Sequence, residues 1–320
     1  MTKHDIGHIN VIKPGWFTTV QDLARYGFQQ YGMPVSGTMD RFAAIVGNRL
    51  VDNPDQTALL ECTLKGPELL FQQDTVIAIT GADLSPTIDD KHVPLWERIA
   101  MPGGSRLRFG AQRSGSRTYL AIAGGIDVPM ILGSRSTHSS SATGGLQGRA
   151  LKPGDILSMG RPTQSADRMM ERRLPDQLRP RYDRSITLRI IPDPRQEYFA
   201  ESALATLTGS SYSVTPQSNR MGYRLTGPQL VRTGSDRFIS DGTVMGALQI
   251  PPDGQPILLM ADRQTTGGYP TIAVVISADL PLAAQLMPGN TIRFTTCTIA
   301  EAQAILRERY ASLDAVLPAR

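Results

Sequence analysis

The chain has few cysteines, histidines and aromatic residues. Of its 320 residues, 2 are cysteine and 4 are histidine, and aromatic residues make up 6%. Cys62 and Cys297 lie far apart in strand-like sequence, which argues against a disulfide framework, and the histidines form no cluster with cysteine at a zinc-site spacing. Few aromatic side chains are available to stack on single-stranded nucleic acid. We therefore expect no metal site, no nucleic-acid partner and a cytoplasmic location.

Long hydrophobic runs are also missing. No segment approaches the run of about 18 apolar residues that a membrane-spanning helix needs, and residues 1–15 hold no uninterrupted apolar stretch. We expect neither a membrane partner nor a secretory leader. With 40% hydrophobic and 19% charged residues, the chain can bury a large core and is long enough for two domains.

Lysine is scarce relative to arginine. Five of the 33 basic residues are lysine, and the net charge is only +4. Arginine binds carboxylates and phosphates in a bidentate fork, so small anions are suitable ligands, although genome composition can produce the same bias. The sequence contains neither GxxxxGK[ST] nor a GxGxxG that opens a helix after a strand.

The middle of the chain separates two halves that share short motifs in the same order. An Arg/Pro-rich segment at 166–184 predicts a linker between an N-terminal domain (1–165) and a C-terminal domain (185–320). The pattern PxSxxM occurs at 34–39 and 216–221, and Gly-Pro-Glu/Gln-Leu at 66–69 and 227–230. We interpret this order as an internal duplication; the unequal spacings leave chance similarity as the alternative.

Short β-branched segments bounded by Gly or Pro dominate both halves. They predict a mainly β fold, built twice as a barrel or sandwich, with a few short helices. One helix is expected after a cap at Ser36 or Thr38, running to residues 48–51. Thr298 with Glu301 forms a capping box for a C-terminal helix through about Tyr310, and 196–207 is a third candidate.

The densest group of polar residues follows the apolar segment 256–260. This loop supplies an acid, a guanidinium, an amide, two hydroxyls, two glycines and a phenol: Asp262, Arg263, Gln264, Thr265, Thr266, Gly267, Gly268 and Tyr269. So many ligand-type groups after a buried strand favour a binding site. The alternative is a tight turn between two strands, which the glycines alone would explain.

Other segments offer further candidate ligands. Arg220 and Tyr223 surround a glycine in the segment 218–224, and Asp83 follows a strand, where it either faces a ligand or stabilises a turn. Ser36, Met39 and Asp40 are additional candidates for substrate binding, with packing as the alternative for Met39. Cys62 lies beside Glu61, but its strand context predicts a buried thiol instead of a nucleophile.

Long stretches of the chain resemble one family. They are 18–51 (TTVQDLARYGFQQYGMPVSGTMDRFAAIVGNRLV), 60–71 (LECTLKGPELLF), 81–84 (GADL), 120–137 (LAIAGGIDVPMILGSRST), 144–155 (GGLQGRALKPGD), 218–225 (SNRMGYRL) and 250–289 (IPPDGQPILLMADRQTTGGYPTIAVVISADLPLAAQLMPG). In these stretches the chain is similar to the KipA family, also described as allophanate hydrolase subunit 2, biotin-dependent carboxyltransferase-like proteins, or the C subunit of 5-oxoprolinase.

The resemblance implies a fold, partners and a reaction. It implies two tandem cyclophilin-like β-barrel domains and a heteromeric complex with a KipI-like B subunit and a LamB/YcsF-like A subunit. In the 5-oxoprolinase interpretation, the complex uses ATP (with Mg) to open the lactam of 5-oxoproline to L-glutamate. ATP is expected at the level of the complex, and no biotin is expected on this chain, because it has no MKM-type lysine segment.

The implied chemistry suggests roles for the candidate residues. A lactam amide is a poor electrophile, and phosphorylating its carbonyl oxygen creates a leaving group, so the site has to hold a carboxylate and polarise an amide. Arg220 or Arg263 would clamp the carboxylate, Asp262 or Asp83 would handle the amide proton, and the amides of residues 267–268 would cradle oxyanions. Gln264 is the fourth catalytic candidate, beside Asp83, Asp262 and Arg263.

Two other interpretations follow from the same resemblance. One is a regulatory KipA-type protein that binds a KipI-like kinase inhibitor and turns over no small molecule. The other is a carboxyltransferase component acting on a urea-like or amide-like substrate, with biotin carried by another protein.

Overall fold

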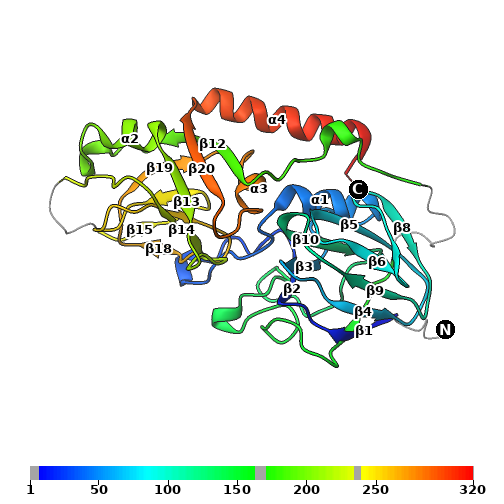
Figure 1. The fold of residues 1–320 in the computed structure, drawn as a ribbon. Coiled ribbons are helices and arrows are strands. Elements are labelled where there is room, and N and C mark those ends of the chain that lie inside the picture. The colour runs from blue at the N-terminus through cyan, green and yellow to red at the C-terminus, as the bar shows by residue number, and fades with distance from the viewer. Residues whose placement is uncertain (1–6, 163–170, 234–238, 320) are drawn as a thin grey trace. The chain divides into compact units, whose positions relative to one another are not determined.

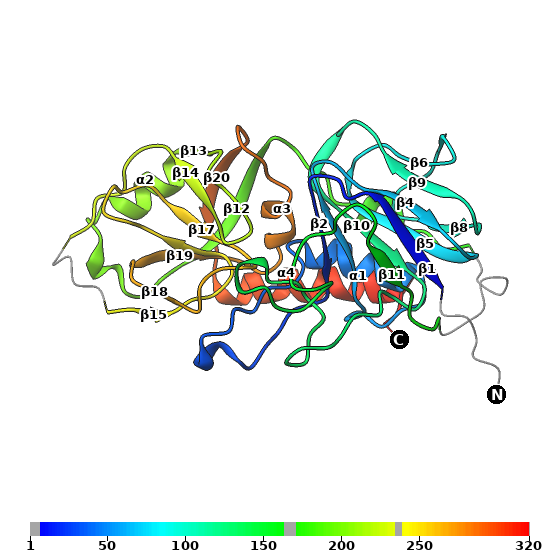
Figure 2. The ribbon, with the colours of Figure 1, turned by 90° about the horizontal axis from the view of Figure 1, so that it is seen from below.

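The computed structural model describes residues 7–162, 171–233 and 239–319, and it divides into two compact units. The first unit comprises residues 1–25, 36–180 and 312–320, and the second comprises residues 26–35 and 181–311. In Figures 1 and 2 the colour follows the residue number, from blue at the N-terminus to red at the C-terminus, so the segments of each unit can be located by number. Residues 26–35 come from the N-terminal half of the sequence but belong to the second unit. Residues 312–320 come from the C-terminal half but belong to the first unit. The predicted domains 1–165 and 185–320 stay a prediction.

The first unit is built on two sheets. The larger has the strand order β11 (Ile156–Ser158), β1 (His8–Lys13), β4 (Glu68–Phe71), β9 (Arg106–Phe109), β6 (Pro86–Ile88), β7 (Lys91–His92). The smaller has the order β2 (Phe17–Gln21), β3 (Leu59–Thr63), β10 (Ser114–Ile122), β5 (Thr75–Asp83), β8 (Arg98–Met101). The strand pairs recorded in both sheets are antiparallel.

The core of the first unit takes side chains from both sheets. Ile9 and Phe71 come from the larger sheet, and Leu60, Ile79 and Leu120 come from the smaller one; all are fully buried. Because side chains alternate along a strand, the neighbouring residues of β5 point to the other face of the smaller sheet. That face is covered by helix α1 (Arg41–Leu50), which packs on β5 and β10.

Helix α1 begins later than the sequence predicted. Its N-cap is Asp40, whose carboxylate accepts a hydrogen bond of 2.9 Å from the amide of Ala43. The expected caps at Ser36 or Thr38 are therefore wrong. Ser36 has a left-handed backbone with φ of 57°, and the Thr38 hydroxyl accepts no hydrogen bond from a backbone amide of the described residues, so neither residue caps the helix.

The second unit contains a closed seven-stranded barrel. Its order is β12 (Ser185–Pro192), β19 (Thr271–Val275), β16 (Ala247–Gln249), β17 (Ile257–Leu259), β14 (Gly222–Thr226), β13 (Ser211–Val214), β20 (Thr291–Thr296). Parallel pairing of β12 with β20 closes the barrel, and the other recorded pairs are antiparallel. A two-stranded ribbon joins β15 (Asp241–Gly242) to β18 (Thr266–Gly267).

Three α-helices lie in the described part of the second half of the chain. They are α2 (Ala203–Gly209), α3 (Leu280–Ala283) and α4 (Ile299–Val316). Thr298 and Glu301 form the predicted capping box: the Thr298 amide donates to the Glu301 carboxylate over 2.7 Å, and the Glu301 amide donates back to the Thr298 hydroxyl over 3.2 Å. Helix α4 continues beyond the predicted end at Tyr310. The helix expected at 196–207 forms only from Ala203.

The mainly β fold with a few short helices is confirmed. The duplication is less regular than expected, because the second unit closes into one barrel whereas the first is divided into two sheets. Residues 166–170 of the predicted linker lie outside the described residues. The following part of the linker packs on the first unit: Leu174 is fully buried, and Arg172 forms a 2.9 Å ion pair with the buried carboxylate of Asp52.

Candidate functional site

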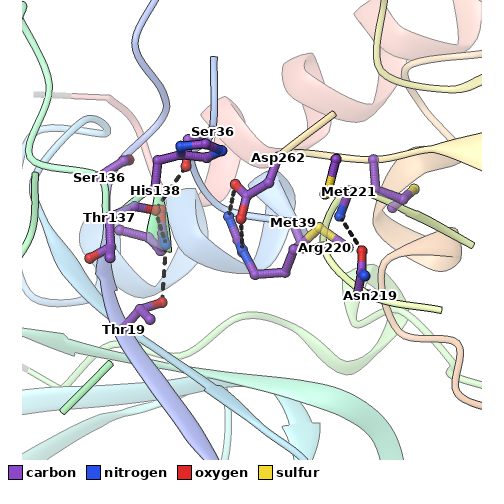
Figure 3. A network of polar contacts seen from close by, with 12 residues as sticks. Thr19, Ser36, Met39, Ser136, Thr137, His138, Asn219, Arg220, Met221 and Asp262 are labelled. Carbon is purple, nitrogen blue, oxygen red and sulfur yellow. Dashed lines mark hydrogen bonds and ion pairs between the residues drawn. The ribbon is translucent and has the colours of Figure 1, made fainter. Parts of the chain in front are cut away.

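Two buried segments of the second unit bring an arginine and an aspartate together. Strands β14 and β17 pair, and the pairing continues beyond their ends, where the amide of Asp262 donates to the carbonyl of Arg220 over 2.8 Å. The guanidinium of Arg220 donates two hydrogen bonds to the Asp262 carboxylate, of 2.8 and 2.9 Å (Figure 3). These predicted site residues are thus each other's partners, and the pairing fixes the start of the loop after β17.

Arg263 differs sharply from its neighbours. Only 7% of the residue is exposed, yet among the described residues no carboxylate lies within ion-pair distance, and its Nε has no hydrogen-bond partner there. Its guanidinium makes a long hydrogen bond, of 3.5 Å, to the carbonyl of Met260. Burial lowers the pKa of this guanidinium, and the hydroxyl of Tyr26 opposes that effect. A buried cation without a counter-ion is costly, so this arrangement suits an anionic ligand.

The rest of the loop is held by amide and hydroxyl groups. Gln264 donates its side-chain amide to the Gln249 side chain over 3.4 Å, and Gln249 donates to the carbonyl of Tyr269 over 3.3 Å. The Thr243 hydroxyl donates to the carbonyl of Gln264. A Cβ on Gly267 would come within 2.3 Å of the Gln249 amide nitrogen. A side chain at 267 would therefore have to displace the end of the Gln249 side chain from its present position.

The backbone of the glycine pair bears on the tight-turn interpretation of the loop. Neither Gly267 nor Gly268 is among the residues with positive φ, so neither provides the left-handed conformation of a tight turn. Gly267 lies in β18, and a Cβ on Gly268 would meet only the Ser240 hydroxyl, at 3.8 Å. The glycines alone do not explain the loop as a turn.

The other candidates of the second unit have different surroundings. Tyr223 is a barrel residue, 2% exposed, whose hydroxyl donates to the carbonyl of Ala284 over 3.3 Å. Thr265 is half-buried, whereas Thr266 and Tyr269 are exposed. Roles for these residues in substrate binding stay predictions, and the position of Tyr223 in the barrel wall also accounts for its presence.

In the first unit, the segment before α1 is anchored by buried polar groups. The Ser36 hydroxyl donates to the carbonyl of Thr137 over 2.9 Å (Figure 3). The amide of Met39 donates to the Glu61 carboxylate over 2.8 Å, and the amide of Asp40 donates to the hydroxyl of Tyr119 over 2.7 Å. Met39 and Asp40 are fully buried. The structure thus shows packing and capping roles for these two; their predicted contact with substrate stays a prediction.

Asp83 lies at the end of β5. Its carboxylate accepts a 2.7 Å hydrogen bond from the amide of Ser85, which is the side-chain contact of an Asx turn. The turn expected as one of the two alternatives therefore forms. No recorded contact of the described residues links the Asp83 side chain to Ser36, Met39 or Asp40.

Several buried polar residues were missed by the sequence analysis. They are Gln21, Asp22, Glu61, Tyr119, Thr243 and Gln249. Glu61 and Tyr119 sit on neighbouring strands at paired positions, and only the register of β3 and β10 brings them together. Gln21 and Asp22 lie in the matched stretch 18–51. For Gln21 the available signal was its spacing of two residues from Thr19, which places both polar side chains on one face of the strand Phe17–Gln21.

Neither a metal cluster nor a membrane span is found in the part of the chain that the structure describes. No three or more His, Cys, Asp or Glu side chains there are arranged to hold a metal ion, and none of the helices is long and apolar enough to cross a bilayer. Both cysteines are free, and Cys62 is buried as the sequence predicted.

Comparison with known proteins gives consistent results. The family model described as carboxyltransferase domain, subdomain A and B, matches residues 31–296. The chain is 40% identical to the C subunit of 5-oxoprolinase from Escherichia coli over 92% of this chain and 93% of that protein. It is 35% identical to the protein of the same name from Haemophilus influenzae, over 93% and 94% of the two chains.

A solved structure is also closely similar. The urea carboxylase of Kluyveromyces lactis superposes with a TM-score of 0.91 at 32% identity, covering 98% of this chain and 30% of that longer one. The family model, at residues 31–296, covers parts of both units and includes the loop after β17. The chain therefore belongs to the carboxyltransferase domain family, subdomain A and B, as the motifs at 18–51 and 250–289 predicted.

Proposed function

We propose that this chain is the C subunit of an ATP-dependent 5-oxoprolinase, which opens the lactam of 5-oxoproline to L-glutamate together with the A and B subunits. The observation that carries the proposal is the buried guanidinium of Arg263, which has no carboxylate partner among the described residues. The substrate 5-oxoproline is a small carboxylate. Its charge would neutralise Arg263, and the long match to two proteins named as the C subunit of 5-oxoprolinase supports the same substrate.

The contacts around Arg263 indicate different roles for Asp262, Arg263 and Gln264. Asp262 is held at both oxygens by Arg220, so it orients the loop and keeps a second anion from binding Arg220. Arg263, one residue later, is left to bind the substrate carboxylate. Gln264 and Gln249 form an amide pair beside it, which offers neutral donors and acceptors for the rest of a small polar substrate.

Binding energy from the carboxylate would serve to orient the lactam. A charge-assisted hydrogen bond in a buried site contributes about 1.5–3 kcal/mol, and fixing a small ring in one orientation lowers the entropic part of the barrier. We assign ATP and Mg²⁺ to the assembled complex. The described residues of this chain offer no phosphate-binding loop and no carboxylate cluster for the metal, so no step through ATP is attributed to them.

The decisive experiment uses the complete complex. The chain is purified with its KipI-like and LamB/YcsF-like partners, and ATP hydrolysis and glutamate formation are measured with and without 5-oxoproline. We expect both activities to depend on 5-oxoproline and on this chain. Arg263→Met should raise KM for 5-oxoproline by about 10–100-fold, the cost of losing a charged hydrogen bond. Arg224→Met, at an exposed arginine of the same unit, is the matched control.

The outcomes separate the function from the site. If 5-oxoproline stimulates no ATP hydrolysis in the assembled complex, the proposed function is wrong, and binding to the KipI-like partner without turnover would favour the regulatory interpretation. If the complex is active but Arg263→Met behaves like Arg224→Met, the function stands and Arg263 is not the carboxylate site.

A carboxyltransferase component is the second candidate. The TM-score of 0.91 to a urea carboxylase favours it, because the likeness covers almost the whole chain. In this case biotin arrives on another protein, and the substrate is an amide or urea-like compound. Transfer of labelled carboxylate from a carboxybiotin carrier to such a compound, dependent on this chain, would support this candidate over the lactam hydrolase.

A further inference from the structure

A buried polar cluster in the first unit surrounds the carbonyl of Thr137. The side-chain amide of Gln21 donates to this carbonyl over 3.0 Å and to the hydroxyl of Thr19 over 3.0 Å. The Ser36 hydroxyl donates to the same carbonyl over 2.9 Å. The amide of Thr38 donates to the carbonyl of the residue after Gln21, which places Thr38 on the chain segment beside it. Figure 3 shows this meeting of the segments around Thr19, Ser36 and Thr137.

Two atoms of this cluster are buried without a partner among the described residues. They are Oε1 of Gln21 and Oγ1 of Thr38, and their residues are 0% and 3% exposed. The orientation of the Gln21 amide is fixed, because the carbonyl of Thr137 can only accept, so the NH₂ group has to face it. Oε1 therefore points elsewhere and can only accept. Buried polar atoms in folded proteins nearly always have a partner, so this pair indicates an occupant.

We propose that Gln21 and Thr38 form a subsite for the amide edge of a neutral ligand group. An amide N–H donates to Gln21 Oε1, and the Thr38 hydroxyl donates to the amide carbonyl. A lactam ring is a cis amide, which presents its N–H and its C=O on one edge. The choice of a lactam rests on the proposed function; a urea-like group offers the same donor and acceptor.

The chemistry of the cluster selects against anions. Gln21 Oε1 and the Thr137 carbonyl can only accept hydrogen bonds, so a carboxylate oxygen placed here would face an acceptor. The acidic side chain bonded nearby, Asp22, is occupied: its oxygens accept from the hydroxyls of Ser134 and Ser136 and from the amides of Ala24 and Arg135. The cluster in the first unit thus suits a neutral amide and not a carboxylate.

The test measures binding of two small lactams to the full-length chain by ligand-observed NMR titration. We expect 2-pyrrolidone to bind saturably, and N-methyl-2-pyrrolidone to bind about tenfold or more weakly, because it lacks the N–H and would leave Gln21 Oε1 unsatisfied. Thr38→Val should weaken the binding of 2-pyrrolidone by a similar factor. This variant removes a hydroxyl that has no partner among the described residues, so it is expected to fold normally.

The control is Thr63→Val. The Thr63 hydroxyl also lacks a partner within the described ranges, but Thr63 pairs with Phe17 at the start of β2, whereas Gln21 lies at its end and pairs with Leu59. We expect Thr63→Val to bind 2-pyrrolidone as the unaltered chain does. Gln21→Met serves as a second variant and should lose binding as Thr38→Val does.

Three results would overturn the subsite. They are equal binding of the two lactams, unchanged binding by Thr38→Val, and no saturable binding at all, which would mean that an ordered water satisfies the two atoms. The titration needs neither ATP nor the partner proteins, so it stands apart from the turnover assay. A complex without 5-oxoprolinase activity leaves the amide subsite measurable, and a failed lactam titration leaves the turnover assay of the unaltered complex to decide the function by itself.

Discussion

Tyr119 donates its phenolic hydroxyl to Oε2 of Glu61 over 2.8 Å, and both side chains are buried to 1% exposure or less. The same two groups hold the backbone before helix α1, through the amides of Met39 and Asp40. Burial raises the pKa of Tyr119 well above its ordinary value, and the nearby charges of Glu61 and Asp40 add to this effect. The phenol therefore remains a hydrogen-bond donor at physiological pH.

Tyr119→Phe should destabilise the first unit. The substitution removes one of the donors to Glu61 and takes the Tyr119 acceptor away from the buried Asp40 amide. We expect a loss of about 1–3 kcal/mol in the free energy of unfolding, measured by urea denaturation. Tyr31→Phe is the control, because Tyr31 is 76% exposed, and it should change stability by no more than about 0.5 kcal/mol. Equal effects of the two variants would contradict the network.

The two buried arginines of the second unit should respond to substitution in opposite ways. Arg220→Met leaves the carboxylate of Asp262 buried without its bidentate partner, which should cost about 3–5 kcal/mol. Arg263→Met removes a buried cation that has no counter-ion among the described residues, so stability should stay equal or rise. Thermal unfolding of both variants, with Arg224→Met as the exposed control, tests this contrast. A large destabilisation by Arg263→Met would show that a partner for this guanidinium has been overlooked.

The thiol of Cys62 should make stability depend on pH in the alkaline range. Burial raises the pKa of Cys62 to about 12, above its ordinary value of 9.0. Between these values the folded chain keeps a proton that the unfolded chain loses, so this thiol lowers stability as pH rises from about 9 toward 12. Its contribution is fully present below pH 9.

The measurement compares the pH dependence of the unfolding free energy in the unaltered chain and in Cys62→Ala. The variant is expected to be less stable at neutral pH because of the cavity, but its stability should fall less steeply above pH 9. Identical slopes for the two proteins would show that the Cys62 pKa is not raised.

The end of helix α4 should be essential for the stability of the first unit. Arg49 forms a 2.6 Å ion pair with Asp314 and donates to the carbonyl of Leu317 over 2.8 Å, and Leu313 and Leu317 are fully buried. Ending the chain after Ala311 removes both leucines, each of which contributes about 1.5–3 kcal/mol by burial. We expect a loss of about 3 kcal/mol or more in urea denaturation.

Asp314→Asn is the matched control for this truncation. The Asp314 side chain is 55% exposed, and Arg49 keeps its two hydrogen bonds of 2.7 and 2.9 Å to Asp55. The variant should therefore lose no more than about 1 kcal/mol. A truncated chain as stable as Asp314→Asn would show that the last turn of α4 does not anchor there.

The elements that could be predicted are those set by neighbours in sequence. The capping box of Thr298 and Glu301 was visible because the two side chains are three residues apart, which is the spacing of one helical turn. The cap of α1 was placed wrongly. Three suitable residues, Ser36, Thr38 and Asp40, compete within one segment, and the choice depends on Glu61 and Tyr119, which hold the backbone from distant strands.

The candidate site likewise combines local features, which the sequence shows, with contacts between distant residues, which it does not show. The polar loop 262–269 was recognised because its composition and its position after an apolar strand are local properties. Which of its two charged residues is free to bind a ligand was not visible. Arg220 lies 42 residues before Asp262, and only the pairing of β14 with β17 makes them partners.

The sequence by itself determined the mainly β class, the family and the segment most dense in ligand-type groups, because strand patterns, caps and motifs are properties of nearby residues. Tertiary structure alone decided that Asp262 has a buried arginine partner, and that Arg263, Gln21 and Thr38 keep buried polar atoms without a partner within residues 7–162, 171–233 and 239–319. The physical reason is that the cost of a buried charge or an unpaired polar atom depends on what strand register and burial place around it.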